Sequence, residues 1–268
     1  PGFAWNAGQW IVNRGLLEKY GWLENEQILN GQGQPYSFDE WVAFLEKVKA
    51  TVPDGIWPTA WSCGDEQGDY SWWGIFWGYG GKLFDENGNV YDDPSGMIDG
   101  YELMVELRDK GLTAKGIAQM KGNMANELMS DGKVVMRPGS LGHARNIKKG
   151  IDEGTLDFEY NIEVFPSPTE KGDSSFNAVG PTGFIFFAQD KAEQDASSEW
   201  VQYAMDDKWW PKMIAATGQF PCQKSLDDAN LYEGNAFQEV ASSMLARFPV
   251  GDFGLANPNY QKIRMAMA

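Results

Sequence analysis

Aromatic rings and carboxylates, the groups that most readily bind a sugar, are concentrated in residues 61–81. Six of the ten residues at 70–79 are aromatic, and the run Gly-Asp-Glu-Gln-Gly-Asp at 64–69 has the composition of a loop. Sugar hydroxyls hydrogen-bond to planar polar groups such as carboxylates, and the apolar C–H faces of a sugar stack on aromatic rings. The stretch therefore predicts one half of a carbohydrate-binding site.

The same aromatic residues also fit a buried helix. Two apolar faces at helical spacing are formed by Trp73, Phe76, Trp77 and Gly80 and by Trp72, Ile75 and Tyr79. A helix that is apolar on all sides is usually buried, so we interpret the later aromatic residues as core. The residues assigned to the surface of the site are Asp65, Glu66, Tyr70 and Trp72.

The composition is that of a folded globular protein. The chain has 268 residues, enough for one or two domains, and 43% of them are hydrophobic. Its net charge of −16 argues against DNA or RNA as partners, because binding them requires Lys and Arg to neutralise phosphates. No apolar run approaches the ~20 residues of a membrane-spanning helix. The chain begins at Pro1, so we expect any signal segment to have been removed or to lie outside it.

Few residues offer catalytic or metal-binding chemistry, and we predict no metal, no cofactor and no enzymatic activity. His143 is the only histidine, which excludes a histidine metal cluster and weakens any catalytic triad. Cys63 and Cys222 have no zinc spacing and are interpreted as unpaired thiols, with one disulfide in an oxidising compartment as the alternative. The acidic turn at 85–89 lacks the ligand register of a calcium loop.

Strands and helices alternate along the chain, which favours an α/β architecture. Ser37 and Glu40 have the spacing of a capping box and predict a helix that ends before Pro53, and Asn87 followed by Gly88 predicts a small hairpin. The other expected elements are strands at 3–13, 133–136, 160–165 and 184–187, helices at 15–20, 97–110, 123–131 and 236–248, and a loop at 218–225.

Two further expectations concern backbone and side-chain placement. The strand at 133–136 is expected to lead into a glycine-rich loop at 137–142, where backbone can approach a ligand closely. A helix capped by Asp190 with Glu193 is expected to bury one face. Its expected inward-facing residues are Trp200, Tyr203 and Ala204.

Taken in order, seven segments resemble the sugar-type extracellular solute-binding proteins of ABC importers, the class that includes maltose-binding protein. The block Met-Ser-Asp-Gly-Lys-Val-Val-Met at 129–136, for example, is similar to the family's FxxGKAAM block. The resembling segments are 10–21, 36–41, 73–81 with the turn at 87–88, 129–136, 165–168, 180–187 and 218–225. Single motifs of this kind are weak, but their shared order over nearly the whole chain is specific.

The resemblance implies a type II periplasmic-binding-protein-like α/β fold with two lobes. Residues 9–177 and 230–268 would form the second lobe, residues 1–8 a crossover, and residues 180–228 a part of the first lobe. Family members carry a long stretch before the position of Pro1 and a helical stretch after that of Ala268, so the chain is expected to be a fragment. Such a fragment would expose one face of residues 184–187.

The resemblance also implies ligand contacts at matching positions. They fall on both crossovers, on the aromatic stretch and on the glycine-rich segment that follows residue 136. The implied contact residues are Trp5, Asn6, Asp65, Glu66, Tyr70, Trp73, Gly139, Ser140, Leu141, Gly142, Gly180, Pro181 and Thr182. Many sugar binders place a stacking tryptophan within 139–142, and this chain has none there.

These observations together predict a binding protein rather than an enzyme. The expected function is to bind a sugar or oligosaccharide outside the cytoplasm, in the periplasm or as a cell-surface lipoprotein. The expected partners are the membrane permease subunits of an ABC importer, and a monomer is expected. Two alternatives stay open, a fragment of a glycoside hydrolase and a non-catalytic interaction domain.

Overall fold

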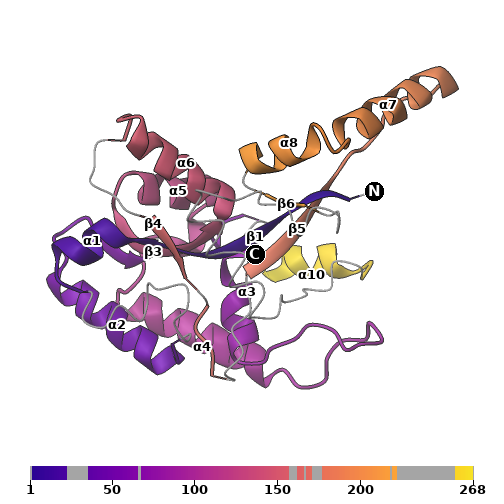
Figure 1. Ribbon diagram of the computed structural model, residues 1–268. Coiled ribbons are helices and arrows are strands. Elements are labelled where there is room, and N and C mark those ends of the chain that lie inside the picture. The colour runs from indigo at the N-terminus through magenta and orange to yellow at the C-terminus, as the bar shows by residue number, and fades with distance from the viewer. Residues whose placement is uncertain are drawn as a thin grey trace.

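The structure is a computed structural model that describes residues 2–22, 36–65, 68–156, 162–165, 167–170, 177–217, 219–221 and 257–267. Helices cover both faces of one mixed sheet (Figure 1). Within these ranges, no helix combines the length and the apolar character needed to cross a membrane. The predicted helix at 236–248 and the thiol of Cys222 lie outside the described residues.

The sheet is organised around its longest described strand, β1 (Gly2–Asn13). The C-terminal half of β1 pairs antiparallel with β3 (Val134–Ser140) and β4 (Ile162–Phe165). The N-terminal half pairs antiparallel with β5 (Asn177–Gly183) and β6 (Phe220–Pro221). The short β2 (Trp57–Thr59) runs parallel to β3 at the far edge. A single strand thus takes part in two groups of strand pairs.

Alternate residues of β1 enter two different cores. Trp10 and Val12 are buried with residues of α1 (Arg14–Lys19), α2 (Phe38–Thr51) and α4 (Ser95–Asp109). Ile11 points to the other face and is buried with residues of α5 (Gly122–Ser130) and α6 (Leu141–Asp152). Side chains alternate across a strand, so a sheet with helices on both faces requires such continuous apolar runs.

The aromatic helix α3 (Asp69–Gly78) packs against α4 and against the sheet strands β3 and β5. Its rings interlock with one another: Trp72 meets Phe76 edge to face at a centroid distance of 5.0 Å, and Trp73 stacks on Trp77 at 5.5 Å. Tyr260, at the start of α10 (Tyr260–Met267), is buried in the same cluster. The sequence-based interpretation of these rings as core is confirmed for Trp73, which is 1% exposed.

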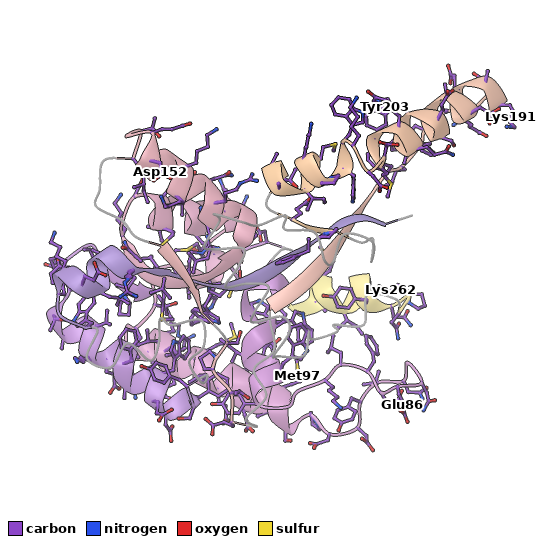
Figure 2. All side chains as sticks on the ribbon, viewed as in Figure 1. Glu86, Met97, Asp152, Lys191, Tyr203 and Lys262 are labelled. Carbon is purple, nitrogen blue, oxygen red and sulfur yellow. The ribbon has the colours of Figure 1, made fainter. Side chains whose placement is uncertain are left out.

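The two helices that follow β5 lie apart from α1 and α2. The helix α7 (Lys191–Ala204) projects away from the sheet, and α8 (Trp210–Thr217) lies between α7 and α6 (Figure 1). Figure 2 shows the side chains of Lys191 and Tyr203 on this projecting arm. A short 3-10 helix, η1 (Ile117–Gln119), precedes α5.

Most predicted elements are confirmed where the structure describes them. Ser37 and Glu40 form the predicted capping box, with the Ser37 hydroxyl accepting from the Glu40 amide at 3.2 Å. A bridge between Phe84 and Val90 encloses the predicted turn, and Asp190 caps α7. Cys63 is free, as expected.

Three element predictions are wrong. The loop expected at 137–142 is instead the end of β3 followed directly by the first turn of α6, because Ser140 caps that helix. The strand expected at 184–187 lies earlier, at β5, because β1 supplies hydrogen-bonding partners to 177–183. The side chains of Trp200 and Tyr203 are 56% and 60% exposed, since the arm packs through Val201 and Ala204 instead.

Residues 184–187, which follow β5, carry exposed apolar side chains, as the resemblance implied. Ile185 is 77% exposed and Phe187 is 84% exposed. An exposed apolar surface of this kind typically marks a contact with further protein.

The contact between α3 and α4 depends on Gly100. An added Cβ at Gly100 would lie 2.3 Å from Cδ1 of the buried Phe76. We expect Gly100→Ala to lower the free energy of unfolding by about 1–3 kcal/mol through overpacking. Gly142→Ala is the matched control, because an added Cβ there would meet nothing closer than Ser140 Oγ at 3.7 Å. Urea unfolding measures both, and equal stabilities of the two variants would contradict this packing.

Candidate functional site

Pairing along β1 brings together predicted contact residues that are far apart in the sequence. Trp5 pairs with Pro181 and Asn6 with Gly180 across β1 and β5. Two residues further along β1, Gly8 pairs with Ser140 at the end of β3. The backbone therefore gathers residues 5–6, 140 and 180–182 along a few residues of one strand.

At this place β1 exchanges its partner strands on both edges. Gly8 pairs with both Ser140 and Asn177, so β3 and β5 lie on opposite edges of β1 at this residue. The edge that carries β3 from Gly8 onward carries β6 at Ala4 and Trp5. Among the described strand pairs, Asn6 has a partner only in β5. At Asn6 and Ala7 this edge of β1 has no partner among the described strand pairs, so the backbone N–H and C=O of the residue that points to this edge could hydrogen-bond to a ligand between β3 and β6.

Ser140 stands at the side of this interval as the N-cap of α6. Its hydroxyl oxygen accepts from the His143 amide at 3.1 Å. The expectation of a glycine-rich binding loop is corrected here, because Gly142 belongs to the first turn of a helix. The start of a helix offers unpaired backbone N–H groups and a positive dipole end, so the segment can still present donors to a polar ligand.

Asp65 is held by a structural contact. Its Oδ2 accepts from the Gly122 amide at 2.9 Å, at the first residue of α5. The neighbouring Ser62 and Ser71 hydroxyls are buried 2.9 Å apart and join this segment to α3. The carboxylate therefore fixes the segment before α3 against α5. Its predicted role as a sugar ligand stays a prediction.

The prediction that Trp72 lies on the surface is wrong. Its side chain is only 3% exposed, because Trp73, Phe76 and Tyr260 pack around it. Glu66 lies outside the described residues, and Tyr70 is described only as a backbone position in the first turn of α3. The predicted ligand contacts at Tyr70, Trp72 and Trp73 remain predictions. The structure adds that α3 packs against both β3 and β5, the strands that meet at Gly8.

Shifted pKa values keep Cys63, Tyr79 and His143 in their neutral forms at neutral pH. Burial raises the pKa of the Cys63 thiol to about 11, with Asp65 adding to the effect. Burial, followed by the charges of Glu170 and other acids, raises the pKa of Tyr79 to about 12. A thiol with so high a pKa is a poor nucleophile at neutral pH. Burial and then the nearby charge of Arg137 lower the pKa of His143 to about 4, which makes it a weak base.

The helix α6 and the burial of Arg137 were not predicted from the sequence. The apolar residues Leu141, Ala144, Ile147 and Ile151 recur at helical spacing and would have predicted the helix. Ser140 three residues before His143 would have supplied its cap. Arg137 carries no such signal, because only the structure shows that it is buried, with 4% exposure.

Solved structures of solute-binding proteins share this architecture. The structure of maltose-bound MalE3 from T. maritima matches with a TM-score of 0.71 at 20% identity, over 99% of this chain and 66% of that one. UgpB from Mycobacterium tuberculosis, in complex with glycerophosphocholine, matches with 0.72 at 16% identity, over 99% and 63%. A solute-binding protein from Agrobacterium radiobacter K84, in complex with ribitol, matches with 0.76 at 15% identity, over 99% and 63%.

These matches establish the class of fold as that of type II periplasmic binding proteins. This chain spans just under two thirds of the length of the solved chains that it matches. The sequence profile of bacterial extracellular solute-binding proteins matches residues 4–209, and the chain belongs to that family. Among curated protein sequences, none matches this chain significantly.

The capping role of Ser140 can be separated from a role in ligand binding. Ser140→Ala removes the acceptor for the His143 amide and should lower the free energy of unfolding by about 1 kcal/mol. Ser140→Asn keeps a capping acceptor and should retain the stability. Urea unfolding of both variants tests this. If Ser140→Ala and Ser140→Asn lowered the free energy of unfolding equally, the Ser140 hydroxyl would not be acting as a helix cap.

Proposed function

We propose that this chain belongs to an extracytoplasmic carbohydrate-binding protein that delivers its ligand to an ABC importer. One observation carries the proposal. Residues that the family resemblance assigns to ligand contact, at positions 5–6, 140 and 180–182, meet where β1 exchanges partner strands. Membership of the extracellular solute-binding family supports the same function.

The proposed lobes follow the two groups of strand pairs. Residues 9–177 and 230–268 would form the second lobe, in which β1 pairs with β3 and β4. Residues 180–228 would contribute to the first lobe, through β5 and β6. Residues 1–8 would be the crossover between them. A ligand held at the crossover would contact both lobes, so its binding would favour the closed arrangement of a hinged protein.

A sugar fits the groups that converge there. Asn6 would take hydroxyls through its amide, Trp5 would stack on an apolar sugar face, and the backbone around Gly180 would complete the hydrogen bonds. Relatives solved with maltose and with laminaribiose show that this fold accommodates such ligands in other proteins. Hydrogen bonds to charged groups contribute roughly 1.5–3 kcal/mol each.

The described residues favour binding over catalysis. Cys63 is a protonated thiol and His143 a weak base, so neither supplies a ready nucleophile or general base at neutral pH. The described ranges contain no group of three or more His, Cys, Asp or Glu side chains that could hold a metal ion. We infer that the protein binds its sugar unchanged, as a monomer, and presents it to the permease subunits of the importer.

Calorimetric titration of the full-length protein tests the proposal. Maltose, laminaribiose and ribitol form the starting panel, extended to longer oligosaccharides, and we expect saturable binding of at least one sugar. Asn6→Ala should weaken that affinity about tenfold, because one hydrogen bond worth about 1.4 kcal/mol is lost. Trp5→Ala should weaken it further through the loss of stacking.

Trp200→Ala is the matched control for Trp5→Ala, because Trp200 is 56% exposed on α7 and should leave the affinity unchanged. Failure of every sugar to bind would contradict a carbohydrate-binding function. Release of reducing ends from an oligosaccharide would instead identify a glycoside hydrolase.

A further inference from the structure

A buried guanidinium lies on the face of the sheet opposite α2. Arg137 belongs to β3, pairs with Ile11 of β1, and is 4% exposed. Ile11 belongs to the core that also contains residues of α5 and α6, so Arg137 shares the layer between β3 and these helices. A charge in such a place requires a compensating charge or several hydrogen bonds.

The described residues accept only some of the hydrogen bonds that the Arg137 guanidinium can donate. Arg137 Nη1 donates to Oδ1 of Asn126 on α5, and Arg137 Nε has no hydrogen-bonding partner among the described residues. No described carboxylate forms an ion pair with Arg137. The acid of α5, Glu127, is exposed, and Asp131, directly after α5, pairs with Lys133 at 2.8 Å. Burial lowers the pKa of Arg137 to about 10, so it keeps its charge at neutral pH.

His143 adds a second donor beside this charge. It lies in the first turn of α6, and its Nε2 is 3.5 Å from Ser130 Oγ on α5. If the Ser130 hydroxyl donates to Nε2, the neutral imidazole carries its proton on Nδ1. Nδ1 is buried and has no partner among the described residues. The other cations of α6 lie outward: Arg145 reaches the Ala216 carbonyl and Lys148 pairs with Asp152.

We propose that Arg137 and His143 bind one small monovalent anion, of the size and charge of chloride, in the layer between β3, α5 and α6. The anion would accept from Arg137 Nε–H and His143 Nδ1–H, the two buried nitrogens that the described protein leaves without partners. It would also neutralise the excess positive charge, which a water molecule would not do. The anion would be held by side chains other than the proposed sugar contacts, and it would stabilise the lobe that β3 belongs to.

Thermal unfolding in matched salts is the first test. The full-length protein is unfolded in sodium chloride and in sodium gluconate at equal ionic strength, because gluconate is too large for a closed interior. A ligand that binds only the folded state stabilises it by RT ln(1 + [L]/Kd), so the Tm should keep rising with the logarithm of the chloride concentration once chloride exceeds its Kd. Arg137→Gln should abolish the difference between the two salts. Arg108→Gln, on the exposed face of α4, should keep it.

The titration of His143 is the second test and needs no variant that disturbs the buried layer. His143 is the only histidine of this chain, and its imidazole signal is followed by NMR in both salts. Chloride should raise the pKa of His143 toward its ordinary value of about 6.5, since an adjacent anion favours the imidazolium.

An equal Tm in the two salts, together with the same His143 pKa in both, would overturn the proposal. If Arg137→Gln fails to fold, the His143 titration in the unchanged protein decides whether the anion binds. These measurements do not involve a sugar, so their outcome is independent of the proposed carbohydrate function.

Discussion

The pairing of β1 with two groups of strands is the interaction on which the rest of the structure depends. Antiparallel hydrogen bonds hold its C-terminal half to β3 and β4, and its N-terminal half to β5 and β6. Because side chains alternate across the strand, the same residues also fill the cores on both faces of the sheet. Changing the register of β1 by one residue would turn Trp10 toward α6 and Ile11 toward α2, so the register is strongly specified.

The strands paired with β1 also fix the position of the aromatic helix α3 in the core. Polar contacts come from the segments next to α3. α3 packs against α4, β3 and β5, and Gly100 allows the ring of Phe76 to approach α4 closely. The dense rings at 72–76 therefore stabilise the position of α3 beside the place where β3 and β5 meet β1. Asp65 and Ser140 fasten the adjoining segments through the helix starts of α5 and α6.

Local features could be predicted from the sequence, and tertiary ones could not. The capping box of Ser37 and Glu40 was predictable because both partners lie within one helical turn. The position of β5 was not, since 184–187 is the more apolar run and only pairing with β1 makes 177–183 the strand. The burial of Trp72 involves Tyr260, which lies 188 residues further along the chain. The family resemblance assigned both Asn6 and Gly180 to ligand contact, but their pairing is seen only in the structure, because no local pattern links residues so distant.

A crystal structure of the full-length protein with its sugar bound would test the central claim most directly. The account predicts that the sugar lies at the exchange of partner strands along β1 and contacts residues 5–6 and 180–182. We also expect Trp72 to remain packed against Phe76 and Tyr260. A sugar bound elsewhere on the protein, with Asn6 and Ala7 paired to strands on both edges of β1, would contradict this prediction.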